Sequence, residues 1–73
     1  MLGRIIKAYI TEKGMKFKVI GEKAGIKRQR FYEILDGKCK IEAVEYFRIC
    51  KALSVEIGYF ADRLENTEIN NAS

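Results

Sequence analysis

The sequence predicts an all-α fold, arranged as one compact domain of five short helices. Apolar residues recur at intervals of three and four along most of the chain, which is the periodicity of helices with one buried face. No stretch alternates apolar and polar residues for long enough to form a sheet, and proline is absent. A chain of 73 residues buries only about 60% of its unfolded surface, so one core is the limit.

The domain is expected to span residues 1–65, followed by a polar tail over residues 66–73 that is predicted to be disordered. An apolar fraction of 48% argues against disorder in the rest of the chain. No apolar run approaches the roughly 20 residues needed to cross a bilayer, and no secretion signal is recognised at the start. These features predict a cytoplasmic protein.

The first two helices are predicted over residues 2–13 and 17–24. Each shows one apolar stripe and is followed by a glycine, Gly14 or Gly25, that can end a helix in the left-handed conformation. The stripes are Leu2, Ile5, Ile6, Tyr9 and Ile10 in the first helix, and Phe17, Ile20, Gly21 and Ala24 in the second.

Three further helices are predicted, over residues 27–35, over residues 42–53 and from about Ile57 onward. Phe31, Ile34 and Leu35 give the third helix a buried face. The stripes of the last two are Tyr46, Ile49, Cys50 and Leu53, then Ile57, Phe60, Ala61 and Leu64. Tyr9, Tyr46, Phe47 and Cys50 are all interpreted as packing residues.

The corner between the second and third helices carries the strongest local signal. A short turn between crossed helices needs a backbone conformation that glycine adopts without strain, and Gly25 is placed there. Gly21, in the middle of the second helix, costs about 1 kcal/mol relative to alanine. That cost is reasonable if the two helices pack closely, so we expect Gly21 to leave space for the third helix.

The positive charge is concentrated around this pair of helices. Residues 13–40 hold nine basic residues and three acidic ones, a net charge of +6, whereas the remainder of the chain carries −2. Such an asymmetry can attract a polyanion, although a solvated basic face is the simpler explanation when charge is considered alone.

The third helix adds side chains suited to reading DNA bases. With its apolar residues buried, Lys27, Arg28, Gln29, Arg30, Tyr32 and Glu33 are directed toward solvent or a partner. Arginine donates two hydrogen bonds to guanine, and glutamine makes the matching pair with adenine. Arg28 and Gln29 lie near the start of the helix, where base edges are met in helix-turn-helix proteins.

These residues resemble the Cro and phage-repressor family of helix-turn-helix domains from about Ile5 to Phe60. The similarity rests on Gly14, IGEKAGI (20–26), ILDGK (34–38) and FRICKALSV (47–55). It implies a five-helix repressor-like domain with the helix-turn-helix at helices two and three, and the third helix in the major groove. The implied function is a transcriptional regulator, a repressor or Cro-like protein, that binds a double-stranded DNA operator.

Carried onto matching positions, the resemblance implies base contacts by Arg28, Gln29 and Glu33. It implies DNA backbone contacts by Lys16, Phe17, Lys18, Lys38 and Lys40. Three residues of the third helix that are directed outward, Lys27, Arg30 and Tyr32, are predicted to contact the DNA backbone as well. The chain departs from the family where Lys16 and Lys27 replace Ser or Thr helix caps and Phe17 replaces a phosphate-binding Gln. Phe17 therefore stays open as a core residue, a partner contact or a contact to a thymine methyl group.

One short domain offers few DNA contacts, so we expect a homodimer whose two third helices lie about 34 Å apart, one turn of DNA. The expected dimer interface surrounds the fifth helix and contains Ile57, Tyr59, Phe60 and Leu64.

Other functional classes find less support in the sequence. Without histidine, a glycine-rich phosphate loop or a nucleophile elbow, the chain is not expected to be an enzyme, and no metal, cofactor or small-molecule ligand is predicted. A redox role for Cys39 would need an exposed, low-pKa thiol. The alternative function is a protein-interaction module, such as an antitoxin or anti-repressor, that uses the same helical scaffold.

Overall fold

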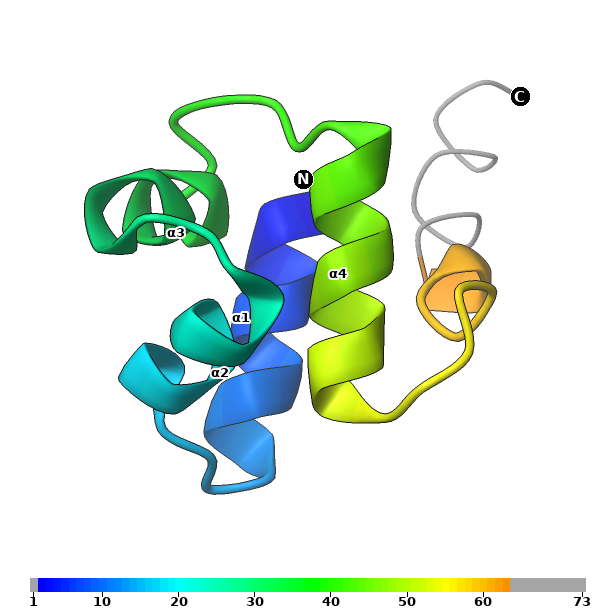
Figure 1. The fold of residues 1–73 in the computed structure, drawn as a ribbon. Helices are drawn as coiled ribbons and strands as arrows, with labels where there is room; N and C mark the ends of the chain where they lie inside the picture. The colour runs from blue at the N-terminus through cyan, green and yellow to red at the C-terminus, as the bar shows by residue number, and fades with distance from the viewer. Residues whose placement is uncertain (1, 64–73) are drawn as a thin grey trace.

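The computed structural model describes residues 2–63, and the regular structure of this part of the chain is helical throughout (Figure 1). The helices are α1 (Leu2–Glu12), α2 (Phe17–Ala24), α3 (Arg28–Leu35) and α4 (Ala43–Leu53). Each begins and ends within one residue of its predicted limits. The all-α prediction is thus confirmed, while the predicted polar tail over residues 66–73 lies outside the described residues.

The segment after α4 differs from the predicted fifth helix, because Ile57 to Phe60 form turns and helical structure begins only at Ala61. Within the turns, the Tyr59 N–H bonds the Glu56 carbonyl and the Ala61 N–H bonds the Gly58 carbonyl. Gly58 lies within these turns, and glycine disfavours a helix by about 1 kcal/mol relative to alanine.

The helices enclose one hydrophobic core. Helix α2 packs against α4 and α3, and α1 packs against α3. The chain after α4 returns to this core and inserts the fully buried Phe60, whose ring meets Tyr9 edge-on at a centroid distance of 5.5 Å. The other buried apolar residues are Ile6, Ile10, Ile20, Ala24, Phe31, Ile34, Leu35, Ile49, Cys50 and Leu53.

The corner between α2 and α3 has the backbone conformation predicted for it. Gly25 adopts φ 69° and ψ 29°, the left-handed region that favours glycine. The N–H groups of Gly25 and Ile26 donate to the carbonyls of Glu22 and Gly21, so they close the end of α2. Only Gly25, Ile26 and Lys27 separate α2 from α3.

Close packing of α2 on α3 explains the glycine within α2. A Cβ atom at Gly21 would lie 2.9 Å from Cδ2 of Phe31, a ring that is itself buried in the core. The predicted role of Gly21 is therefore confirmed.

A second close approach, between α1 and α3, involves a glycine that the sequence did not single out. A Cβ atom at Gly3 would lie 1.9 Å from the carbonyl oxygen of Ile34. Since that oxygen belongs to the backbone, it cannot move aside by a change of rotamer. Gly3 is therefore required for α1 to lie against the last turn of α3.

Candidate nucleic-acid interface

Helix α3 has a buried face and an exposed face. Phe31, Ile34 and Leu35 are each about 1% exposed, so they fix the helix against the core. Arg28 and Gln29, predicted to contact bases, are exposed in its first turn, and Glu33 is half-buried one turn later. The first two side chains are thus freely accessible to a ligand, and the third is partly accessible.

The starts of α2 and α3 lack side-chain caps. The flanking residues are Lys16 and Lys27, and neither makes a side-chain hydrogen bond to the amides of its helix. Lysine has no acceptor, so these first-turn amides remain available to water or to an anion. Both lysines are exposed and add positive charge at the same helix ends.

A pocket of about 150 Å³ opens where the first turn of α2 meets the first turn of α3. Phe17 and Tyr32 form its wall, with ring centroids 6.4 Å apart and planes at 74°. Lys18 and Arg28 also line it, and the Arg28 guanidinium lies 5.9 Å from the centre of the Tyr32 ring. Phe17 thus packs against the core and still reaches the surface beside predicted DNA contacts.

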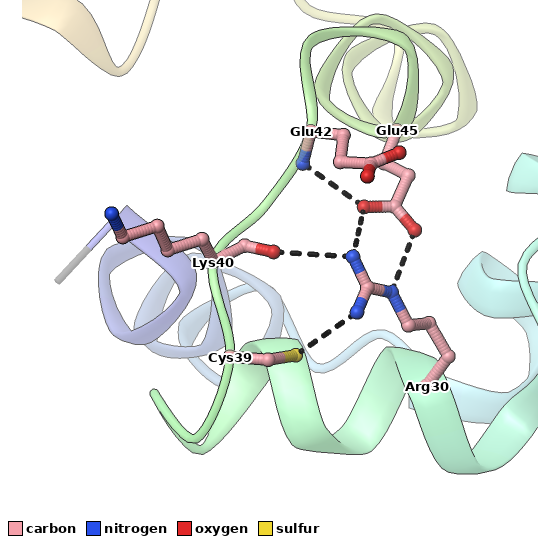
Figure 2. Close-up of polar contacts among 5 residues, drawn as sticks. All are labelled: Arg30, Cys39, Lys40, Glu42 and Glu45. Atoms are coloured by element: carbon pink, nitrogen blue, oxygen red, sulfur yellow. Dashed lines mark hydrogen bonds and ion pairs between the residues drawn. The ribbon is translucent and has the colours of Figure 1, made fainter.

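Arg30 is bound within the protein, as Figure 2 shows. Its Nε and Nη2 donate to the two carboxylate oxygens of Glu45 at 2.8 and 2.9 Å, and Nη2 also donates to the Lys40 carbonyl at 3.2 Å. Nη1 lies 3.5 Å from Sγ of Cys39. We call this set of contacts the Arg30 clamp.

The clamp gives Arg30 a structural role, because most of its donors are used in joining α3 to the following loop and to α4. Its predicted contact to the DNA backbone stays a prediction. Glu45 extends the clamp by accepting a hydrogen bond of 3.0 Å from the N–H of Glu42, just before α4. This paired arrangement raises the pKa of Arg30 and lowers the pKa of Glu45.

The loop held by the clamp contains the predicted phosphate contacts Lys38 and Lys40, and both are exposed. Cys39, between them, is half-buried beside Arg30, so the exposed thiol that a redox role requires is not observed. Cys50 lies in the core, as predicted, and burial raises the pKa of its thiol.

Acid should weaken the clamp, because hydrogen bonding by Arg30 holds the folded-state pKa of Glu45 below its ordinary value of 4.5. The stabilisation is complete above that value and is lost as the pH falls through the folded-state pKa. We expect Glu45→Gln to be less stable than the unmodified protein at about pH 7, with a gap that narrows toward about pH 3. Urea unfolding measured across this range tests the prediction, and a gap independent of pH would contradict it.

Asp36 also makes the unmodified protein and Glu45→Gln less stable in acid. Lys7 Nζ donates to its Oδ1 at 2.8 Å, and this contact lowers the pKa of Asp36. Both proteins should therefore lose stability in acid, and only the difference between them reports on Glu45.

The predicted dimer interface needs one correction. Phe60 is 0% exposed and belongs to the core, so it cannot offer its ring to a second copy. Ile57 and Tyr59 are exposed, at 57% and 38%, while Leu64 lies outside the described residues. The Tyr46 hydroxyl donates to the Ile57 carbonyl and fixes this segment to α4, and burial raises the pKa of Tyr46 to about 12.

Two apolar residues of α4 are exposed, although the sequence did not predict them to lie at the surface. Val44 is 56% exposed and Phe47 is 51% exposed, although Phe47 was interpreted as a packing residue. The interpretation was wrong because the buried stripe of α4 passes through Ile49, Cys50 and Leu53, which leaves Phe47 on the outer side of the helix. Tyr9 and Tyr46 do pack against the core, as predicted.

Residues 2–63 contain neither a candidate membrane span nor a candidate metal site. No helix in this range is both long enough and apolar enough to cross a membrane. The same residues place no three His, Cys, Asp or Glu side chains together in a group that could hold a metal ion.

Comparison with known proteins adds no relative from which a function could be transferred. No protein-family model, no curated protein and no solved structure matches this chain.

Proposed function

We propose that this protein is a sequence-specific, double-stranded DNA-binding transcriptional regulator, a repressor or Cro-like protein, that reads the major groove with α3. The observation that carries the proposal is the exposure of Arg28 and Gln29 at the start of a helix whose opposite face is buried. A recognition helix needs this combination, because its side chains must reach base edges from a rigid support.

The two exposed side chains and the half-buried Glu33 match the chemistry of bases. Arg28 supplies the paired donors that recognise O6 and N7 of guanine, and Gln29 supplies a donor and an acceptor for adenine. Glu33 can accept a hydrogen bond from the amino group of cytosine. These three residues are assigned to base recognition.

Five exposed lysines are assigned to phosphates. Lys16 and Lys18 lie at the start of α2, Lys27 directly precedes α3, and Lys38 and Lys40 lie in the loop after α3. Contacts to phosphates fix a protein on the duplex without specifying sequence. The Arg30 clamp acts indirectly here, because it holds the Lys40 backbone against α3.

A symmetric homodimer is part of the proposal, since a single domain of this size makes few base contacts. Ile57 and Tyr59 remain in the proposed interface after Phe60 is assigned to the core. Such a dimer would place two copies of α3 about one DNA turn, or 34 Å, apart and would bind an approximate palindrome.

Selection from randomised duplex DNA tests the proposal. The purified protein is mixed with the pool at about 150 mM salt, and the retained duplexes are sequenced. Enrichment of a palindrome with half-sites near one turn apart supports a dimeric operator-binding regulator. Folded protein that retains no preferred sequence would refute the sequence-specific function.

Arg28→Ala is expected to relax sequence preference at one position of the selected operator. Loss of a bidentate contact to guanine should cost about 1 to 3 kcal/mol on the operator and much less on random DNA. Arg48→Ala is the matched control, because Arg48 is also an exposed arginine but lies on α4. Competition binding measures the affinity of both variants for the operator and for random DNA. If Arg28→Ala lost the same affinity on both DNAs, Arg28 would contact no base.

The alternative is a protein-interaction module such as an antitoxin or anti-repressor. It is favoured by the exposure of four large apolar residues in and after α4, namely Val44, Phe47, Ile57 and Tyr59. Replacing Phe47 and Tyr59 by serine distinguishes the two functions. A module that acts through a protein partner would lose that partner, whereas a DNA regulator would keep base preference even if its dimer weakened.

A further inference from the structure

We propose that the pocket between α2 and α3 receives the 5-methyl group of a thymine in the operator. The inference rests on the proposed function, because it requires α3 to lie in the major groove. It assigns a specificity-determining role to Phe17, a residue of α2, in addition to the base contacts of α3.

The pocket has an apolar interior of suitable size. Phe17, Ile26, Phe31 and Tyr32 supply the apolar lining, and its volume is about 150 Å³. One water molecule takes up roughly 30 Å³ in the liquid, so a methyl group and the adjoining edge of a pyrimidine ring can both be accommodated. In the major groove, the 5-methyl group is the apolar feature that marks thymine.

The charge at the rim favours DNA over an apolar peptide as the source of that group. Lys18 and Arg28 line the pocket, and the exposed Lys16 and Lys27 directly precede two lining residues, Phe17 and Arg28. Glu22 is the single acidic residue of the lining. An apolar pocket surrounded mainly by cations is complementary to a methyl group that is flanked by phosphates.

Arg28 also fixes where the thymine should lie. Its guanidinium sits over the Tyr32 ring, which forms part of the pocket wall. A guanine bound by Arg28 and a methyl group in the pocket must therefore come from neighbouring base pairs. We expect the selected operator to contain, in each half-site, a thymine next to the guanine whose recognition is lost in Arg28→Ala.

Replacement of thymine by deoxyuridine tests the inference with the unmodified protein. Deoxyuridine keeps every hydrogen-bonding group of thymine and lacks only the 5-methyl group. Each thymine of the selected operator is replaced in turn, and the dissociation constant is measured at about 150 mM salt. We expect a loss of about fourfold at one position in each half-site, and about fifteenfold when both are replaced.

Two variants test whether the loss of affinity with deoxyuridine arises at the pocket. Phe17→Ala should bind the thymine and deoxyuridine operators equally, whereas Phe47→Ala, which removes an exposed ring on α4, should keep the difference. Circular dichroism confirms that each variant is folded, and the measurement on the unmodified protein stands if Phe17→Ala does not fold.

The outcomes separate this inference from the function on which it rests. Specific operator binding with no response to any deoxyuridine would overturn the pocket assignment and leave the regulator intact. A response that persists in folded Phe17→Ala would place the methyl group elsewhere. Absence of any preferred DNA, as in the selection experiment, would refute the proposed function itself.

Discussion

Gly3→Ala is expected to lower the free energy of unfolding by about 2 to 3 kcal/mol, as overpacking of a close contact does. The added Cβ atom would lie 1.9 Å from the backbone carbonyl oxygen of Ile34, so α1 and α3 would have to separate. Alanine's better helix propensity, about 1 kcal/mol, offsets only part of this cost. Urea unfolding followed by circular dichroism measures the change.

Gly58→Ala provides the matched control for this measurement. A Cβ atom at Gly58 would have no neighbour within 4 Å, and its φ lies outside the left-handed region. We expect its stability to stay within about 0.5 kcal/mol of the unmodified protein. If the two alanine variants proved equally stable, the close approach of α1 to α3 would not exist in solution.

Salt is expected to weaken DNA binding by about five hundredfold between about 50 mM and about 200 mM. The figure follows if the five exposed lysines at positions 16, 18, 27, 38 and 40 each neutralise one phosphate. Each such contact contributes a slope of roughly −0.9 in a plot of log affinity against log salt concentration. Fluorescence anisotropy with a labelled duplex gives the slope directly, and a dimer would make it steeper.

Single lysine variants connect this slope to particular residues. Lys38→Ala should reduce its magnitude by about 0.9 and weaken binding to operator and random DNA equally. Lys51→Ala, which removes an exposed lysine of α4, should leave the slope unchanged. Binding to the duplex that hardly responds to salt would contradict the assignment of these lysines to phosphates.

Local sequence signals were sufficient to predict helices α1 to α4 and the corner between α2 and α3. The apolar stripes determine which face of each helix is buried, and Gly25 ends α2 through its own backbone conformation. The role of Gly21 could be predicted because glycine within a helix is unfavourable unless close packing requires it. The Phe31 ring packs at this position. The helix limits and the corner are thus determined by residues that lie within or next to them in the sequence.

Features that depend on distant residues could not be predicted in this way. Gly3 meets Ile34, and Phe60 packs beside Tyr9, across contacts that no local pattern encodes. Arg30 lies among the exposed basic residues of α3 in the sequence, and only the fold brings Glu45 to it. The pocket beside Phe17 likewise requires the relative placement of two helices.

Different residues of α3 anchor the helix and face a possible ligand. Phe31, Ile34 and Leu35 hold the helix in the core, and Arg30 ties it to α4. Gln29 and Glu33, by contrast, form no side-chain hydrogen bond or ion pair with any other described residue. Under the proposed function, substitutions at these two positions would alter the preferred DNA sequence without removing a side-chain hydrogen bond or ion pair of the scaffold, so the chain would be a starting point for a set of proteins with different targets.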